Sequence, residues 1–154
     1  MLTPWTVRPA SAADAAGILA LEQACAEAPH WSPAVWQRIL SREEAQQPAR
    51  AAFIAEGGNG ILGFAVVSCA AAVAELESIA VRPSARCQGI GKALCHAAFD
   101  WSRTAGAAVI ELEVRASSLA AHALYASLGF AEQGRRRNYY RNPADDAILM
   151  SAPL

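Results

Sequence analysis

The segment from Arg86 to Lys92 carries residue types suited to binding chemistry, because Gly89 and Gly91 lie between two cationic side chains. An apolar run that ends at Val81 comes before it, and a helical pattern follows it. In such a strand–loop–helix unit the free N–H groups of the helix N-terminus point to one spot and bind anions. Glycines let the backbone approach a phosphate without an intervening Cβ. The segment therefore predicts a site for a phosphate-bearing ligand, and the alternative is an ordinary helix start with glycines in a tight turn.

Two common phosphate-binding loops do not fit this segment. A Walker A loop needs Ser or Thr after Gly-Lys, to bind magnesium, but Ala93 follows Lys92 and Arg86 takes the place of the first glycine. A dinucleotide-binding fingerprint needs a third glycine where the chain has Leu94. The pattern that remains is Arg-x-x-Gly-x-Gly.

Two further side chains are suited to proton transfer. Glu113 lies in a run where acidic and apolar residues alternate, and Tyr125 lies between Leu124 and Leu128 in a helical pattern. Carboxylates and phenols are among the side chains that act as general acids and bases in enzymes. The same patterns are typical of the solvated face of a strand and of a core tyrosine. The residues alone leave both interpretations open.

The composition favours one domain and excludes several classes of protein. The chain has 154 residues, 54 % of them apolar, and a net charge of −1. This charge does not favour a nucleic-acid partner, no apolar run reaches the ~18 residues of a membrane span, and residues 1–5 lack signal-peptide features. The four cysteines and three histidines lack metal-ligand or disulfide spacing. We therefore expect reduced thiols in a cytoplasmic protein, no metal site, and Cys87 as a small residue that fits the loop.

Periodicity and turn signals predict the elements that position these residues. We expect strands at 6–8, 51–56, 61–68, 73–81, 109–114, 130–140 and 146–150. We expect helices from Ser11 to about Ala28, from Ser32 onward, from Gly89 to Gly106 and from Ser118 to Leu128. The polar tract 43–48 is expected to be a surface connection. The order β-α-α-β-β-β-α-β-α-β-β predicts an α/β (α+β) fold, with a mixed central sheet of about seven strands and about four flanking helices.

Five motifs in order resemble one known family. The Arg-x-x-Gly-x-Gly loop resembles the acetyl-CoA pyrophosphate loop of the GNAT superfamily of N-acetyltransferases. The motifs that follow are LEVRASS at 112–118, ALYASLGF at 123–130, RRNYY at 136–140 and DDAILM at 145–150. They resemble the group that acetylates the N-terminal alanine of a ribosomal protein (the RimI type), and Pro29 to Ser32 resembles that group's Pro-Trp-Ser segment more loosely. The resemblance runs from about Ala74 to Met150 and implies a single acetyltransferase domain over residues 1–154.

The resemblance implies where acetyl-CoA binds. In the GNAT fold two neighbouring parallel strands, here 73–81 and 109–114, splay apart at a bulge, and the pantetheine arm lies between them like an added strand. The backbone near Val81 would polarise the acetyl carbonyl. The implied cofactor-binding residues are Ile79, Ala80, Val81, Arg86, Cys87, Gln88, Gly89, Ile90, Gly91, Lys92 and Ser118. Ser118 departs from the usual asparagine, so the grip on acetyl-CoA is expected to differ there, although serine can still cap the helix.

The resemblance also assigns the chemistry. Glu113 matches the group's general base and Tyr125 its general acid, while Trp31 and Tyr139 are expected to touch the acceptor. An amine must be neutral to attack a thioester, and an α-amine of pKa ~8 is neutral far more often near pH 7 than a lysine amine of pKa ~10.4. The implied partner is a protein or peptide N-terminus, that of a ribosomal protein, bound by a monomer or weak dimer without direct nucleic-acid or membrane contact. Two alternatives remain, which are acetylation of a lysine or small-molecule amine and a non-catalytic acyl-CoA-binding module.

Overall fold

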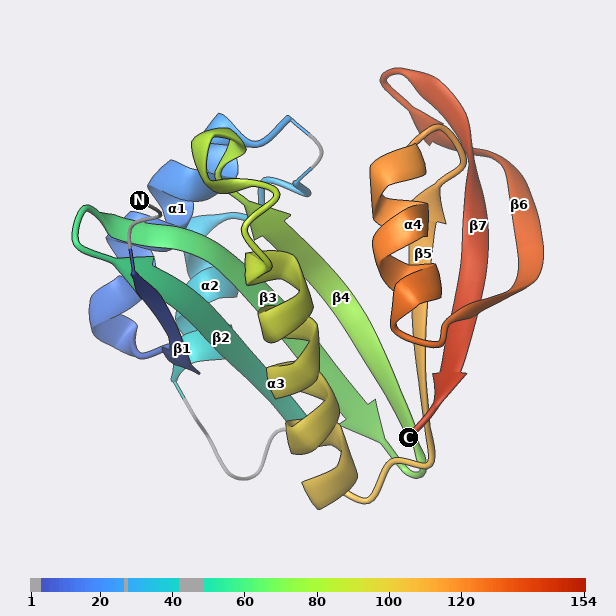
Figure 1. The fold of residues 1–154 in the computed structure, drawn as a ribbon, viewed down its shortest axis with the longest axis horizontal. Coiled ribbons are helices and arrows are strands. Elements are labelled where there is room, and N and C mark those ends of the chain that lie inside the picture. The colour runs from blue at the N-terminus through green and yellow to red at the C-terminus, as the bar shows by residue number, and fades with distance from the viewer. Residues whose placement is uncertain (1–3, 27, 42–48) are drawn as a thin grey trace.

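A computed structural model of the chain, which describes residues 4–26, 28–41 and 49–154, is built around one seven-stranded sheet (Figure 1). The strands are β1 (Trp5–Pro9), β2 (Ala49–Gly57), β3 (Gly60–Ala70), β4 (Val73–Val81), β5 (Val109–Arg115), β6 (Ala131–Arg141) and β7 (Ala144–Pro153). The helices are α1 (Ala15–Ala24), α2 (Pro33–Leu40), α3 (Ile90–Thr104) and α4 (Leu119–Ser127), with short 3-10 turns at Ala12–Asp14 and Pro83–Ala85. The predicted fold class and order of elements are confirmed.

The sheet is mixed, and its one parallel pair lies in the middle. The strand order is β1-β2-β3-β4-β5-β7-β6, and β4 runs parallel to β5 while every other neighbouring pair is antiparallel. Gly57 pairs with Gly60 at the β2–β3 hairpin, as the glycine-rich turn predicted. Helix α3 joins β4 to β5, as a parallel pair requires a crossover.

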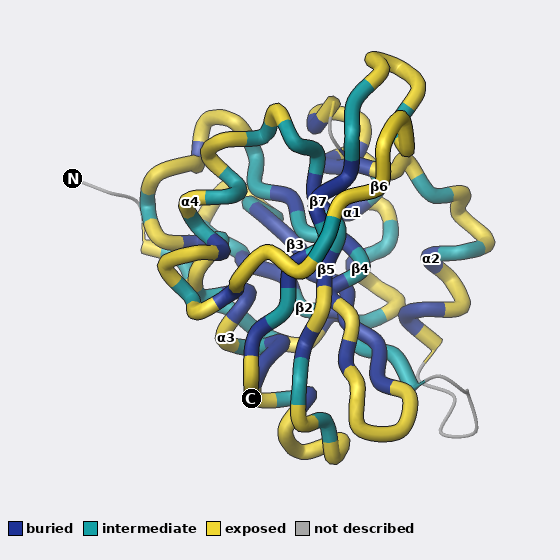
Figure 2. The backbone as a smooth tube through the Cα atoms, turned by 90° about the vertical axis from the view of Figure 1, so that its right-hand side faces the viewer, coloured by how far each residue is buried: buried dark blue, intermediate teal, exposed yellow. Residues whose placement is uncertain are grey.

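The two faces of the sheet carry separate hydrophobic layers. Helices α1 and α2 pack on β2 and β3, and we call this the α1–α2 layer; its helical members are Ile18, Leu21, Trp36, Ile39 and Leu40. Helices α3 and α4 cover the opposite face with a second layer, which we call the α3–α4 layer; it includes Leu94, Cys95, Leu112, Tyr125 and Phe130. Buried segments run through the centre of the molecule between these helices (Figure 2). Apolar stripes on the helices and alternation in the strands thus produce a sheet covered on both sides.

A β-bulge in β4 changes which side chains face which layer. Val66 of β3 pairs with Ser78 and Val67 pairs with Leu76, so one extra residue, Glu77, lies between them on β4. Before the bulge Leu76 faces the α3 side, and after it Ala80 faces the α1–α2 layer. Such an insertion bends a strand and increases its twist. A bulge was expected from the family resemblance, and the structure confirms it.

Strands β4 and β5 separate soon after they meet. Their residue pairs are Val73–Val109, Ala74–Ile110 and Glu75–Glu111, which is only the first third of β4. Beyond Glu75 the strands diverge toward the end where α3 begins (Figure 1). The splayed pair that the resemblance implied is therefore present.

Two expectations need correction or fall outside the described residues. The first helix was expected to reach about Ala28, but it ends at Ala24 because Cys25 is extended and its thiol donates to the Val81 carbonyl at 3.7 Å. A tertiary contact thus overrides a local helical pattern. The tract 43–48 lies outside the described residues. In the part of the chain that is described, no helix is long and apolar enough to cross a membrane.

The close packing between the sheet and α3 can be tested by a substitution at Gly63 of β3. A Cβ on Gly63 would lie 2.9 Å from the Ala80 carbonyl oxygen and 3.1 Å from Leu94 Cδ1. Gly63→Ala should therefore lower the free energy of unfolding by about 1–3 kcal/mol, measured by denaturant titration. Gly58→Ala is the control, because a Cβ there meets no atom within 4 Å. Equal losses in both variants would contradict this account of the packing.

Candidate active site

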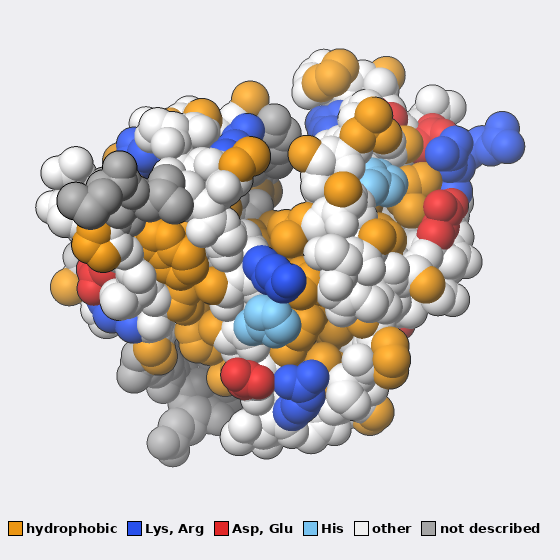
Figure 3. All heavy atoms as spheres, in the orientation of Figure 1, with side chains coloured by type: hydrophobic (Ala, Val, Ile, Leu, Met, Phe, Trp, Pro, Cys, Tyr) orange, Lys and Arg blue, Asp and Glu red, His pale blue; other side chains and the backbone are white. Residues whose placement is uncertain are grey.

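The divergence of β4 and β5 leaves a gap with backbone hydrogen-bonding groups along its sides. Among the described strands, β4 has no partner on its β5 side after Glu75, whereas β5 stays paired with β7 on its other edge from Val109 to Arg115. We call this space the β4–β5 gap. The space-filling view shows the surface hollowed between the α3 and α4 sides, with hydrophobic side chains in the hollow (Figure 3). An extended ligand with amide groups can pair with such an open strand edge.

The predicted anion-binding loop lies at the wide end of the gap, where α3 begins. Gly89 is the N-cap of α3 in the left-handed region, with φ of 83°, and a Cβ there would meet no atom within 4 Å. Ala93 N–H donates to the Gly89 carbonyl, so the N–H groups of the first helical turn before it are left without a helical acceptor. Arg86 Nε donates to the Val81 carbonyl at 3.1 Å and ties the loop to the end of β4. This geometry could therefore hold an anion, as predicted, and Lys92 is exposed beside it.

The two glycines, Gly89 and Gly91, are needed for different structural reasons. A Cβ on Gly91 would lie 3.2 Å from Leu124 Cδ2, so this glycine lets α3 approach α4 closely. Gly89 instead provides a left-handed backbone in open space. Cys87 also has a positive φ, of 63°, and is exposed, while Ile90 is buried and can face a ligand only through its backbone.

Ser118 lies at the N-cap of α4 but does not cap it with its side chain. The expectation of a serine cap is thus wrong in its detail. Instead the His122 ring contacts the Arg115 carbonyl at 3.0 Å, and Ser117 Oγ donates to Asp145 Oδ2 at 2.6 Å. These contacts hold the turn before α4 in place and leave the Ser118 hydroxyl outside the cap.

Glu113 projects from the face of β5 opposite to its buried neighbours. Leu112 and Val114 pack in the α3–α4 layer, and the Glu113 side chain retains 27 % of its exposure. Arg136 of β6 reaches it, with Nη2 at 3.4 Å from Glu113 Oε1. Glu113 is thus a half-buried, ion-paired acid rather than a fully solvated one. Three consecutive arginines occupy positions 135–137, and the sequence alone did not show which of them would reach Glu113.

Other carboxylates share this face with Glu113. Burial raises the pKa of Glu75, and the negative charges of Glu77, Glu113 and Glu111 raise it further. Arg50 of β2 offsets part of this charge because its Nε donates to Glu77 Oε2 at 2.7 Å. The start of the gap is therefore an acidic region, which suits an acceptor that carries positive charge.

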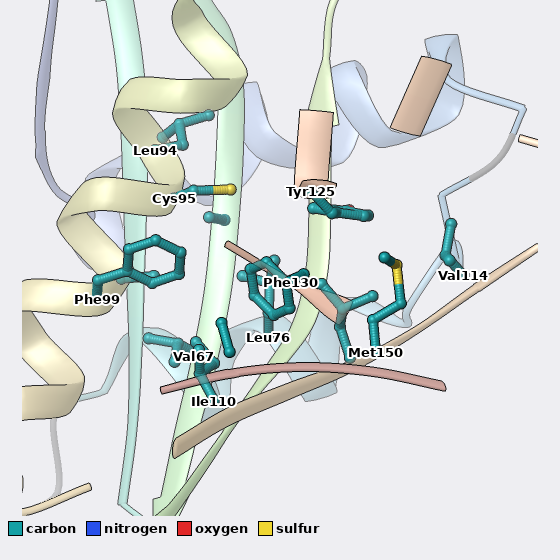
Figure 4. Packing of buried hydrophobic residues seen from close by; sticks show 14 of the residues in the cluster. Val67, Leu76, Leu94, Cys95, Phe99, Ile110, Val114, Tyr125, Phe130 and Met150 are labelled. Atoms are coloured by element: carbon teal, nitrogen blue, oxygen red, sulfur yellow. The ribbon is translucent and has the colours of Figure 1, made fainter. Parts of the chain in front are cut away.

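Tyr125 lies deep between α3 and α4. It is 6 % exposed, its ring meets Phe130 edge-on at 5.6 Å, and it belongs to the same buried cluster as Cys95 of α3 (Figure 4). Burial raises the pKa of the phenol well above its usual value, and Cys95 and Tyr140 add to the effect. No hydrogen bond holds the hydroxyl to any residue that the structure describes. Tyr125 is therefore a protonated phenol at neutral pH, available as a donor.

Tyr140 was not among the predicted site residues, but this half-buried residue of β6 interacts electrostatically with both Glu113 and Tyr125. Burial raises the pKa of Tyr140, Glu113 raises it further, and Arg115 opposes the shift with Cζ 4.2 Å above the ring. Tyr140 also contributes to the raised pKa of Tyr125. The register of β6 shifts between Arg136 and Tyr140, and the rings of Tyr139 and Tyr140 meet at 5.1 Å, so simple alternation along a strand could not place Tyr140.

The two residues predicted to contact the acceptor come from different parts of the chain. Trp31 precedes α2 and packs on Trp36, with ring centroids 5.3 Å apart. Tyr139 is 49 % exposed near the end of β6 and meets Tyr140 edge-on at 5.1 Å. The α1–α2 connection and the β6–β7 hairpin stand on opposite sides of the wide end of the gap (Figure 1). Within the described ranges, no cluster of three or more His, Cys, Asp or Glu residues could hold a metal ion.

The known proteins that this chain resembles in sequence and in structure are N-acetyltransferases. Residues 18–130 match the acetyltransferase (GNAT) family model. The [ribosomal protein bS18]-alanine N-acetyltransferase of Escherichia coli K12 is 45 % identical over 99 residues, which are 62 % of this chain and 67 % of that protein. The Salmonella typhimurium protein of the same name is 37 % identical over 135 residues, which are 79 % and 90 % of the two chains. The crystal structure of the E. coli ribosomal-protein-S18-alanine N-acetyltransferase superposes with a TM-score of 0.83 at 34 % identity, over 97 % of this chain and 94 % of that one.

The raised pKa of Tyr125 can be tested by phenol titration. Because its pKa lies far above the ordinary value of about 10, Tyr125 should contribute nothing to phenolate absorbance until well above pH 11. Absorbance at about 295 nm should therefore rise equally in the wild type and in Tyr125→Phe up to that pH, while circular dichroism confirms that both remain folded. A smaller rise in Tyr125→Phe near pH 10 would contradict the burial of this hydroxyl.

Proposed function

The chain belongs to the acetyltransferase (GNAT) family of enzymes, and from this premise we propose that it transfers the acetyl group of acetyl-CoA to the α-amine of a protein N-terminus. The observation that carries the proposal is the β4–β5 gap, which joins the anion-binding loop to Glu113 on β5 and to Tyr125 on α4. The curated relatives act, by name, on an alanine of ribosomal protein bS18. A ribosomal protein that begins with alanine is therefore the proposed acceptor.

The residues around the gap fit acetyl-CoA. Its pyrophosphate would lie against the N–H groups of the first α3 turn, over the open space at Gly89. Its pantetheine amides would pair with the free edge of β4 from Ile79 to Val81. The remaining proposed contacts are Arg86, Cys87, Gln88, Ile90, Gly91, Lys92 and Ser118. When bound, acetyl-CoA supplies an activated thioester as the acetyl donor.

Glu113 is the proposed base. An α-ammonium must lose a proton before its nitrogen can attack, and a carboxylate oxygen of Glu113 would accept that proton directly or through a water. Arg136 holds one of these oxygens at 3.4 Å, so the guanidinium must give way when the amine approaches. The acidic surroundings that include Glu75 favour the approach of a cationic N-terminus.

Tyr125 is the proposed acid. Its hydroxyl stays protonated because burial disfavours the phenolate. It can therefore give a proton, or a strong hydrogen bond, to the departing thiolate. No covalent enzyme intermediate is needed, so Cys87 has no assigned part in the chemistry.

The acceptor would enter between the α1–α2 connection and the β6–β7 hairpin. Trp31 and Tyr139 are the proposed contacts on the two sides, and Tyr140 is added to them because it lies near Glu113. We expect the enzyme to work in the cytoplasm as a monomer or weak dimer, with no direct contact to nucleic acid or to a membrane.

The choice of amine can be tested with matched peptides. We expect acetylation of a peptide that begins with alanine and no acetylation of the same peptide with a blocked N-terminus and a free lysine, because only the α-amine is substantially neutral near pH 7. The measurement is mass spectrometry after incubation with acetyl-CoA. Equal acetylation of the blocked peptide would favour a lysine or small-molecule acceptor instead, and binding of CoA without any transfer would favour a non-catalytic module.

The catalytic assignments predict the effect of two conservative variants. Glu113→Gln and Tyr125→Phe should each lower kcat by about 10²-fold or more, because each removes one proton-transfer group. Calorimetry should find acetyl-CoA affinity close to that of the wild type. Glu132→Gln, which changes an exposed acid on β6, is the matched control and should keep full turnover. Unchanged kcat in either catalytic variant would remove the role assigned to that residue.

A further inference from the structure

Glu22 is an acidic residue inside the α1–α2 layer. It lies on α1 and is 2 % exposed, next to Leu21 and one helical turn before Cys25, which are both buried in that layer. A carboxyl group in apolar surroundings costs free energy unless hydrogen bonds replace its contact with water. Its presence there therefore needs a structural reason.

Glu22 makes one side-chain hydrogen bond, and that bond goes to α2. Trp36 Nε1–H donates to Glu22 Oε1 at 3.2 Å, while Oε2 is buried without a hydrogen-bond partner among the described residues. A half-satisfied buried acid does not stabilise a fold, and an apolar residue of similar size would fill the same space at lower cost. The residue is thus poorly explained by stability alone.

Trp36 connects this bond to the edge of the gap. Its ring is fully buried, meets Phe64 of β3 edge-on at 5.1 Å and supports the Trp31 ring at 5.3 Å. The hydrogen bond to Glu22 fixes how the indole is rotated, and Trp31 rests on that indole. A contiguous path therefore runs from Glu22 on α1, through Trp36 on α2, to the connection beside the wide end of the gap.

We propose that Glu22 is a positioning residue for acceptor binding, which acts by holding Trp36 and, through it, Trp31 in the orientation that receives the acceptor. This inference rests on the proposed function, because it takes Trp31 as an acceptor contact. Glu22 touches neither the acetyl donor nor the reacting amine. Its loss therefore changes how well the acceptor binds and leaves the binding of acetyl-CoA unchanged.

Three variants test the path, each assayed for KM of the alanine peptide, KM of acetyl-CoA, kcat and thermal stability. Glu22→Leu and Trp36→Phe should each raise KM for the peptide about tenfold, since each removes the same hydrogen bond, and leave KM for acetyl-CoA and kcat within about twofold. Glu22→Gln keeps an oxygen that accepts from the indole, so it should retain a nearly wild-type KM for the peptide. Glu22→Leu removes the orphaned Oε2 but leaves the buried Trp36 Nε1–H without its acceptor, so the melting temperature of each variant is needed to separate a loss of stability from a loss of positioning.

The double variant and a control distinguish positioning from general damage. Glu22→Leu with Trp36→Phe should raise KM for the peptide no more than either single change, because both act through one bond. Leu21→Met, at the equally buried neighbour on α1, should leave both KM values unchanged. A peptide KM unchanged in Glu22→Leu and Trp36→Phe, or raised together with the acetyl-CoA KM, would overturn the proposal.

A failure of the proposed function would be visible separately in the same assay. The wild type would then acetylate a different amine and leave the alanine peptide unmodified. The same variants would be measured with that amine, and an unchanged KM for it would overturn the positioning role of Glu22 as well.

Discussion

The early separation of β4 and β5 is the constraint on which the rest of the structure depends. Backbone N–H and C=O groups inside a protein need partners, and two central strands that part after three residue pairs leave many of them without one. The bulge at Glu77 and the helix α3 between the two strands build this divergence into the fold. In the proposed function, the acetyl-CoA arm with its own amides would supply the missing strand in the middle of the sheet.

The two helical layers pack on opposite faces of the sheet, and each positions different residues of the candidate site. The α3–α4 layer places the anion-binding loop and Tyr125, and the contact between Gly91 and Leu124 keeps its helices close. The α1–α2 layer lies on the other face and ends in the connection that carries Trp31. In the proposed function, donor and acceptor would thus be bound from opposite faces of the sheet, which meet at the β4–β5 gap.

Burial and charge act differently on the two proposed proton-transfer groups. Tyr125 is buried among apolar and aromatic side chains, so its neutral form is favoured. Glu113 lies on the opposite face, among other carboxylates and beside the guanidinium of Arg136. From there its carboxylate would accept a proton from an incoming ammonium group. An acid–base mechanism needs a proton donor and a proton acceptor in different surroundings, and the two faces of the sheet provide such surroundings.

Periodicity and turn signals in the sequence alone determined the order of the elements, the mixed sheet and the loop at Arg86 to Lys92, because these depend on neighbours within a few residues. The family motifs pointed to Glu113 and Tyr125. Only the tertiary structure decided that α1 ends at Ala24, that Gly91 faces α4, that Arg136 pairs with Glu113 and that Tyr140 packs against Arg115. Each of these depends on contacts between residues far apart in the chain. The hydrogen bond between Glu22 and Trp36 is the clearest case, because an acidic residue in a helical pattern is normally expected to face solvent.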